Sequence, residues 1–222
     1  MHILIVAPFC TLPGEQGYNR FLYLAELLAK DHKVSLATSK FRHYDKSFRL
    51  CNDTRKPSFR VYFIHEPGYT SNISLMRLYS HKVFCANFES FFLAFCETAG
   101  TPDIVYAAYP LARISIFLGS IKSSYDFKLI VDVQDVWPES IKSAFPLLSL
   151  IPDTLFPFSW TANSAYRSAD ALVAVSNTYL KRALTVNPFA HSHVTYIGAS
   201  RELIDSVSPT IYDSNSINAV YI

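Results

Sequence analysis

The 222-residue sequence has little glycine and little charge, and these two shortages exclude several classes of protein. It contains six glycines, and charged residues make up 17% of the chain while hydrophobic residues make up 50%. Intrinsic disorder needs the opposite balance, with low hydrophobicity and high charge. Lys and Arg number 20 against 18 Asp and Glu, so the chain lacks the basic field of a nucleic-acid-binding protein, and no nucleic acid is expected as a partner.

Membrane-spanning runs and metal-binding cysteine motifs are also missing. No uncharged apolar run approaches the roughly 18 residues that cross a bilayer. The four cysteines, at positions 10, 51, 85 and 96, form no Cys-x-x-Cys pair and stand at no zinc-finger spacing from a histidine. We therefore expect reduced cysteines and no metal site. The expected location is the cytoplasm, either in solution or peripherally on the inner face of the cell membrane.

Apolar runs and helical periodicity alternate along the chain. Seven short apolar runs predict strands buried on both faces, at 2–7, 33–38, 59–64, 103–108, 128–133, 171–175 and 193–197. Helical patterns lie between them, at 21–30, 73–96, 111–121 and 177–184, with a proline-broken helical stretch ending near 167 and a loop over 41–57. This alternation predicts an α/β fold: a Rossmann-like, doubly wound and mostly parallel sheet of about seven strands, with helices on both faces.

The loop after the first predicted strand is one candidate site. It contains Gly14 and Gly17 and leads into a helix whose first turn carries Arg20. It lacks the G-x-G-x-x-G fingerprint and the later acidic residue that a nicotinamide dinucleotide site requires. Exposed amides before a helix suit an anionic group, to which Arg20 would add a charge-assisted hydrogen bond. The alternative is that the glycines only turn the chain and that Arg20 is solvated.

The segment after the strand at 128–133 is the second candidate. Asp132, Asp135 and Glu139 follow one another at the carboxyl end of this apolar run, around a Trp-Pro pair. Charges at such a position are costly unless they are paired or used. Glu139 is explained equally well by a structural role, and Asp132 with Asp135 lacks an evident third ligand for a metal. Trp137 suits either the core or a platform on which a sugar stacks.

The Asp-x-x-Asp-x-Trp-Pro-Glu-Ser segment, placed after a buried strand, resembles the N-terminal domain of GT-B glycosyltransferases of the retaining family 4. The likeness is closest to the bacterial branch that builds O-antigen lipopolysaccharide and capsule polysaccharide. Other stretches agree with it, namely Ile3-Leu4-Ile5-Val6, Arg20 to Val34, Ser168 to Ser176 and Val194 to Gly198. The resemblance covers about 1–200. It implies a GT-B N-terminal domain over 1–200, with 201–222 as a linker and the start of a truncated second domain.

The resemblance implies the acceptor-binding half of an enzyme that moves a sugar from a nucleotide-sugar donor to a glycan acceptor, expected to be lipid-linked. The donor would bind mainly to the missing half, in a separate domain or chain, so no cofactor is expected here. Asp135 falls where the family places a polar residue against the transferred sugar, and it is the expected catalytic residue. The other expected cleft residues are Gly14, Gly17, Arg20, Tyr109, Pro110, Trp137 and Gly198.

Two departures from the family leave other readings open. The glycine loop lacks the paired glycines that are common in the family, and the donor domain with its E-x7-E segment is absent from the sequence. The alternatives are a stand-alone nucleotide-binding α/β domain with a regulatory or epimerase-like role, and an inactive fragment of a disrupted gene.

The predicted helix over 73–96 has more apolar residues than one buried stripe requires. Its aromatics include Phe84 and Phe88, and Arg77 and Lys82 lie near its start. Aromatics beside basic residues suit an interfacial helix that contacts an anionic membrane surface, and these four residues are the expected membrane contacts. The alternative is that the extra aromatics pack under the 41–57 loop or against the missing domain.

Overall fold

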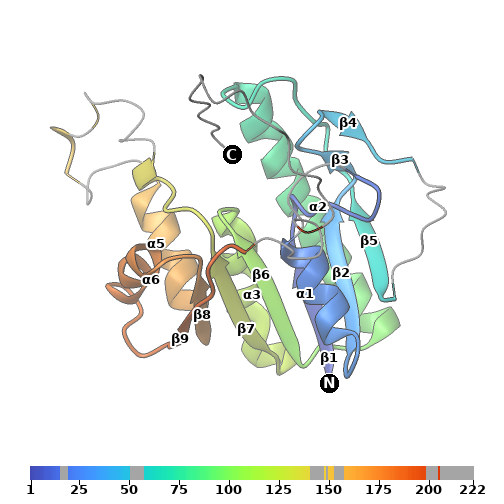
Figure 1. The fold of residues 1–222 in the computed structure, drawn as a ribbon. Coiled ribbons are helices and arrows are strands. Elements are labelled where there is room, and N and C mark those ends of the chain that lie inside the picture. The colour runs from blue at the N-terminus through green and yellow to red at the C-terminus, as the bar shows by residue number, and fades with distance from the viewer. Residues whose placement is uncertain are drawn as a thin grey trace.

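A seven-stranded parallel sheet forms the centre of the molecule (Figure 1). The computed structural model describes residues 1–15, 20–50, 58–140, 148, 150–152, 158–198 and 205. The strands are β1 His2–Val6, β2 Lys33–Ser39, β5 Arg60–Ile64, β6 Ile104–Tyr109, β7 Lys128–Val133, β8 Ala171–Ala174 and β9 His191–Val194. Their spatial order is β5-β2-β1-β6-β7-β8-β9, and every neighbouring pair is parallel. The predicted Rossmann-like α/β fold is confirmed.

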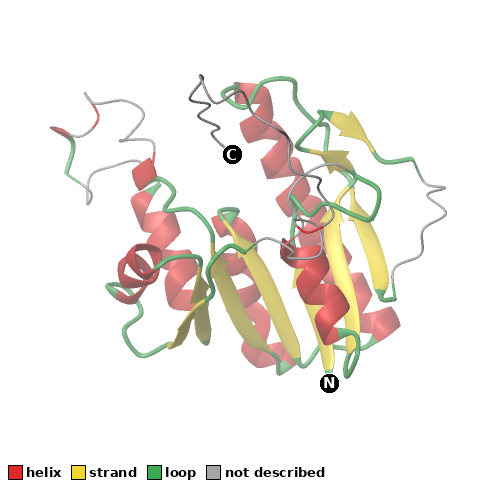
Figure 2. Ribbon diagram, viewed as in Figure 1, coloured by secondary structure: helices red, strands yellow, loops and turns green. Residues whose placement is uncertain are grey.

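The sheet is covered by helices on both faces, because its central strands are apolar on both sides. On one face, Phe21, Leu22 and Ala25 of α1 (Arg20–Leu28) pack in a core that contains Ile3 and Ile5 of β1. On the opposite face, Leu4 and Val6 of the same strand share the larger core with four helices. Those helices are α2 Leu75–Ala99, α3 Ala112–Tyr125, α5 Ser159–Ser168 and α6 Asn177–Leu184 (Figure 2). A strand buried on both faces carries a continuous apolar run rather than an alternating one.

The long helix α2 turns most of its phenylalanines inward. Its N-terminus is capped by Ser74, whose hydroxyl accepts a hydrogen bond from the Arg77 amide, and it ends at Gly100, which has a φ of 85°. Phe84, Phe88 and Phe92 are 0% exposed and pack against the sheet and α3. The expectation that Phe84 and Phe88 contact a membrane is therefore wrong. Spacings of four residues place these rings on one stripe, and that stripe faces the core.

The region 41–57, expected to be a loop, holds a small second sheet in the part that the structure describes. Strands β3 (Phe41–Arg42) and β4 (Ser47–Phe48) pair antiparallel, and their Phe rings lie 5.3 Å apart between centroids. Lys46 adopts a φ of 58° in the turn. Two-residue strands are too short to show alternation in a sequence. Residues 51–57 lie outside the described ranges.

Strand β9 begins two residues earlier than predicted. Its residues His191, Ser192 and His193 are exposed because β9 is the edge strand of the sheet, so its sequence carries no continuous apolar run. The expected linker and second-domain start at 201–222 lies outside the described residues, apart from Asp205. Within the described ranges, no helix is long and apolar enough to cross a membrane.

Candidate functional site

The carboxyl ends of all seven strands lie at one edge of the sheet, which is the upper edge in Figure 1. Ligands of open parallel sheets bind at this edge. A cavity of about 240 Å³ lies here and is lined by the segments that follow β1, β2 and β7. We call it the carboxyl-edge cavity. Its lining residues are Phe9, Cys10, Thr11, Glu15, Arg42, His43, Tyr44, Asp45, Arg49 and Gln134.

A buried ion pair between Arg20 and Asp132 joins the segments around this edge. Asp132 is 0% exposed, and its carboxylate accepts hydrogen bonds from Arg20 Nε at 2.9 Å and from the Tyr106 hydroxyl at 2.9 Å. Arg20 also donates through Nη1 to the Thr195 carbonyl at 3.1 Å. Burial alone would lower the pKa of Arg20, but the Asp132 carboxylate raises it above its usual value. Arg20 is neither solvated nor free for a phosphate, because its guanidinium already binds Asp132 and Thr195.

A second buried ion pair holds the loop after β1. Arg49 donates to Glu15 from Nε and from Nη2, and both hydrogen bonds are 2.7 Å long. The side chains of Arg49 and Glu15 are only 6% and 8% exposed. Arg49 also donates from Nη1 to the Ser39 carbonyl and from Nη2 to the Cys10 carbonyl, and Glu15 accepts from the Leu12 amide at 2.9 Å. These contacts fix the wall of the cavity next to Gly14, which is exposed and has a φ of 89°. Gly17 lies outside the described residues.

Two histidines share the hydroxyl of Tyr69, and one of them, His43, lines the carboxyl-edge cavity. His43 Nδ1 lies 2.5 Å from this oxygen and His81 Nε2 lies 3.4 Å from it. Phe9 packs against both imidazoles, with ring centroids 5.0 Å and 5.4 Å apart. Burial, and then the charge of Arg77, lower the pKa of His81 to about 4, and burial followed by the charges of Lys46 and Arg77 does the same for His43. Both imidazoles are therefore neutral near pH 7.

Asp135 lies next to Gln134, which lines the carboxyl-edge cavity. Its side chain is half-buried. Among the residues that the structure describes, no hydrogen bond or ion pair holds this carboxylate. Glu139, by contrast, pairs with Arg182 Nε at 2.5 Å, in the structural role considered for it. Asp132, Asp135 and Glu139 thus occupy three different environments.

Tyr109 does not face a cleft. It is 1% exposed, packs on Tyr166 with ring centroids 5.1 Å apart, and donates its hydroxyl proton to the Trp137 carbonyl. Its hydrogen bond to the Trp137 carbonyl therefore helps to hold the segment after β7 in place. Trp137 is half-buried, with its ring 5.1 Å from that of Phe158.

Two further expected cleft residues also follow strand ends. Pro110 is half-buried and comes directly after β6. Gly198 follows β9, and a side chain built there would meet no atom within 4 Å.

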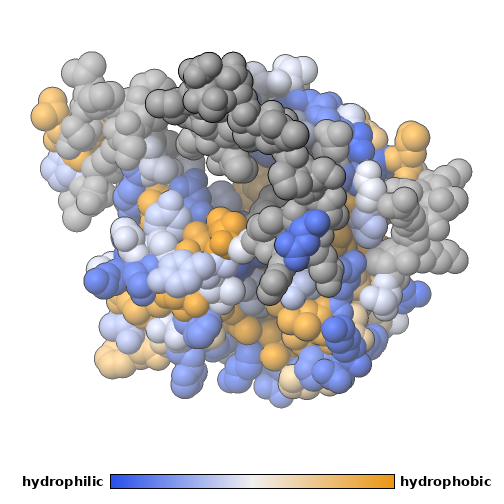
Figure 3. Space-filling view, in the orientation of Figure 1, coloured by the Kyte–Doolittle hydropathy of each residue, from blue (hydrophilic) through white to orange (hydrophobic). Residues whose placement is uncertain are grey.

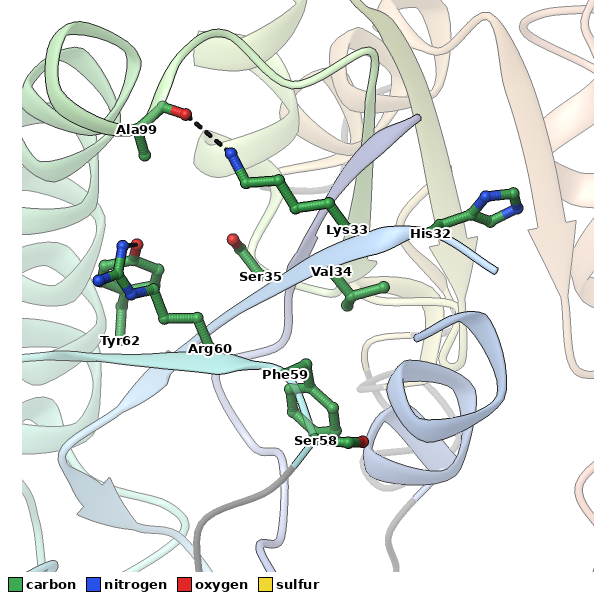
Figure 4. Close-up of a pocket in the computed structure, with 9 residues that line it drawn as sticks. All are labelled: His32, Lys33, Val34, Ser35, Ser58, Phe59, Arg60, Tyr62 and Ala99. Atoms are coloured by element: carbon green, nitrogen blue, oxygen red, sulfur yellow. Dashed lines mark hydrogen bonds between the residues drawn. The ribbon is translucent and has the colours of Figure 1, made fainter. Parts of the chain in front are cut away.

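A larger cavity, of about 490 Å³, lies at the opposite edge, where β2 and β5 begin (Figure 4). Lys33 donates to the Ala99 carbonyl across it at 3.0 Å, and His32 points away from the other labelled side chains. Hydrophilic residues are frequent along the lower rim of the molecule, where the strands begin (Figure 3). We favour the smaller cavity as the site, because ligands of parallel sheets bind beyond the carboxyl ends of the strands.

Solved structures with the same architecture include proteins that bind nucleotide sugars. One is UGT2 of Phytolacca americana, complexed with UDP-2-fluoroglucose and pterostilbene (TM-score 0.53, 10% identity, 92% of this chain and 56% of that chain). Another is HepE of Anabaena, in complex with UDP (TM-score 0.50, 14% identity, 91% of this chain and 46% of that chain). The fold is similar to that of GT-B glycosyltransferases.

A third structure with this fold is the N-terminal domain of trehalose-6-phosphate phosphatase from Candida albicans (TM-score 0.58, 10% identity, 92% of this chain and 50% of that chain). The chain thus spans about half the length of the structures that it matches. No protein-family model matches the sequence, and no curated protein matches it. At these identities the likeness establishes the GT-B-like fold and leaves the activity to the site.

The histidine cluster is the part of the site that the sequence did not reveal. His43, Tyr69 and His81 come from the β3–β4 hairpin, the segment after β5 and helix α2, so no local motif contains them. The only signal in the sequence was that His43 lies in the region 41–57, which was predicted to be a loop.

Proposed function

We propose that this chain is the acceptor-binding half of a glycosyltransferase that moves a sugar from a nucleotide-sugar donor to a glycan acceptor. The observation that carries this proposal is the carboxyl-edge cavity, which is built by the loops after β1, β2 and β7 on a GT-B-like sheet. Asp135, which has no hydrogen bond or ion pair among the described residues, follows the same strand end as Gln134 of the cavity wall. We propose that the donor binds mainly to a further domain or chain. The chain spans about half the length of the structures that it matches.

Asp135 is the proposed catalytic residue. A half-buried carboxylate beside the reacting sugar stabilises the positive charge that develops on the ring, or orients a hydroxyl. The test is a transfer assay with the chain combined with its donor-binding partner, using radiolabelled nucleotide sugars and a glycan acceptor. Asp135→Asn is expected to lower the turnover by about 100-fold without changing the stability. Unchanged turnover in this variant would refute the assignment.

A stand-alone nucleotide-binding domain is the competing function, and saturation-transfer NMR on the purified chain separates the two. An acceptor-binding half gives signals from saccharides and only weak signals from UDP and UDP-glucose. A nucleotide-binding domain gives strong UDP signals that decrease when the loop at 11–15 is altered. Strong nucleotide binding without any saccharide binding would replace our proposal with the second function.

The proposed acceptor is lipid-linked and the proposed location is peripheral, on an anionic membrane surface. The start of α2 and the residue before its N-cap support this, because Ile73 and Leu75 are 83% and 85% exposed and Leu78 is 55% exposed. Lys82 is exposed beside them, and Arg77 lies on the same turns. Exposed apolar side chains next to cations are the features of an interfacial segment. The contact would thus involve the start of α2 rather than its buried aromatic stripe.

Liposome co-sedimentation tests the membrane contact. Binding to anionic vesicles is expected, with weakening at high salt and loss in Leu75→Glu/Leu78→Glu. Leu93→Glu, on an exposed position farther along α2, is the matched control and should bind like the wild type. If the wild type does not bind anionic vesicles at low salt, the membrane contact is refuted, whereas the glycosyltransferase proposal is not affected.

A further inference from the structure

The carboxyl-edge cavity carries no net charge, although four charged side chains line it. Arg49 is paired with Glu15, and its Nε, Nη1 and Nη2 atoms all donate to carbonyl or carboxylate oxygens. Only one N–H of Nη1 has no acceptor among the described residues. Arg42 is paired with Asp45 and also donates to Ser47 Oγ. A ligand in this cavity therefore meets paired charges and neutral polar groups such as the Gln134 amide and the His43 imidazole. Such a lining favours a neutral molecule with many hydroxyls over an anion, which would need unpaired cations.

One wall of the cavity is aromatic. Phe9 lines it, and its ring packs against the imidazole of His43, which also lines the cavity, and against that of His81. Gln134, from the segment after β7, lies in the same lining and offers both an amide donor and an acceptor. An apolar ring beside groups that both donate and accept is complementary to a sugar, which has C–H groups on its faces and hydroxyls around its rim.

His43 is held in one orientation by Tyr69. Its Nδ1 is bound to the Tyr69 hydroxyl at 2.5 Å, and a neutral imidazole has one donor nitrogen and one acceptor nitrogen. The Tyr69 hydroxyl has a single proton, and it interacts with both His43 and His81. Among the described residues, no hydrogen bond engages His43 Nε2. This nitrogen is therefore the one available to a ligand of the cavity, and its ring is already fixed.

The size of the cavity limits what it holds. A volume of about 240 Å³ is below the roughly 300–1,000 Å³ of pockets for drug-sized ligands. It suits one monosaccharide unit and excludes a complete nucleotide sugar.

We propose that the carboxyl-edge cavity is a subsite for one neutral sugar ring of the acceptor, with Phe9 as the stacking face and His43 as the fixed hydrogen-bonding group that orients the ring. This inference rests on the proposed function, which it makes specific: the acceptor ends in an uncharged sugar, and His43 is a specificity-determining residue. The reacting hydroxyl of that sugar then lies near the segment that carries Asp135.

The experiment is saturation-transfer NMR on the purified chain with glucose, galactose, N-acetylglucosamine, glucuronate and inorganic phosphate as separate probes. At least one neutral sugar is expected to bind, while glucuronate and phosphate do not. His43→Phe keeps an aromatic ring but removes the nitrogen, and should weaken the binding about tenfold. Phe9→Leu keeps the apolar volume but removes the ring face, and should weaken it by a similar factor. His32→Gln, at the opposite edge of the sheet, is the control with unchanged binding.

Two results overturn the inference. Binding of phosphate or glucuronate but of no neutral sugar would make the cavity an anion site, and neutral-sugar binding unaffected by His43→Phe and Phe9→Leu would place the sugar elsewhere. In the assembled enzyme, His43→Phe should raise the KM for the acceptor while the KM for the donor is unchanged. If transfer occurs and the acceptor KM does not change, the subsite fails and the proposed function stands. If a neutral sugar binds through His43 but no transfer is found, the subsite stands and the proposed function fails.

Discussion

At the scale of single residues, neighbouring acidic side chains have separate roles that depend on their partners. Asp132 points into the molecule and neutralises Arg20, from which it is separated by 112 positions. Asp135, three residues later, has no hydrogen bond or ion pair among the described residues, and it follows the carboxyl end of β7. The sequence shows two similar acids in one motif, and only the fold separates Asp132, which is buried in an ion pair, from Asp135, which we propose as the catalytic residue.

This division predicts opposite results for two similar substitutions. Asp132→Asn leaves the Arg20 charge buried without its counter-ion and should lower the free energy of unfolding by about 3–5 kcal/mol. Asp135→Asn should change it by less than about 0.5 kcal/mol, as expected for a site without such contacts. Urea unfolding monitored by circular dichroism measures both variants. Equal stability losses would show that Asp135 also has a structural partner.

The two histidines around Tyr69 predict a loss of stability in mild acid. They are faced by Lys46 and Arg77 on the cationic side, and by Asp45, near Lys46, and Glu66, near Tyr69, on the acidic side. Their pKa values are about 4 in the folded protein, against about 6.5 in an unfolded chain. Between these values the unfolded state binds more protons, so the free energy of unfolding should fall as the pH decreases from about 6.5 toward 4.

Thermal unfolding at several pH values tests this effect. The double variant His43→Gln/His81→Gln should lose less stability between pH 7 and pH 5 than the wild type, because it has two fewer groups that take up protons on unfolding. Each single variant should lie between them. If the double variant and the wild type have the same pH dependence, these histidines are not the source of the effect.

At the scale of elements, the packing of α3 against α5 depends on the absence of a side chain at Gly119. A Cβ atom there would lie 2.2 Å from Ser168 Cβ and 3.2 Å from Ser168 Cα. Contacts this short cannot be relieved by turning one flexible side chain, since part of the obstruction is backbone. The two helices approach each other at this point because the residue is glycine.

Gly119→Ala is therefore expected to destabilise the protein by about 1–3 kcal/mol through overpacking. For a domain of this size the melting temperature should fall by about 2–4 °C per kcal/mol. Ser120→Ala, at the next and exposed position of the same helix, is the control and should have little effect. An unchanged melting temperature in Gly119→Ala would mean that α5 shifts without cost.

The elements that the sequence predicts best are strands whose residues are mostly buried and helices with one regularly spaced buried face. The runs at 2–7 and 128–133 are mostly apolar because most residues of β1 and β7 are buried, and the helix at 177–184 is found with the same bounds. The hairpin of β3 and β4 and the start of β9 were missed, since two-residue strands and an exposed edge leave no periodic signal. The site was less predictable. Arg20, Tyr109 and His43 take their roles from partners that are distant in the sequence.

At the scale of the whole molecule, the proposed acceptor site occupies one edge of the sheet, where the carboxyl ends of the strands lie. Catalysis of sugar transfer requires donor and acceptor to be held in contact, and one domain provides only part of those contacts. The purified 222-residue chain is therefore expected to bind saccharides without hydrolysing or transferring a nucleotide sugar. Release of UDP from UDP-glucose by the chain alone, above the rate without protein and lost in Asp135→Asn, would contradict this.

The order of strands in the sheet also determines when a newly made chain can fold. β1 pairs with β2 on one side, but its other neighbour, β6, begins only at Ile104. Arg20 finds its counter-ion 112 positions later and its carbonyl partner 175 positions later. During synthesis on the ribosome, the first hundred residues therefore have an open apolar strand edge and a cation without its partner. The sheet can close around β1 only after β6 and β7 have emerged, so stable folding must await the synthesis of residues 104–133.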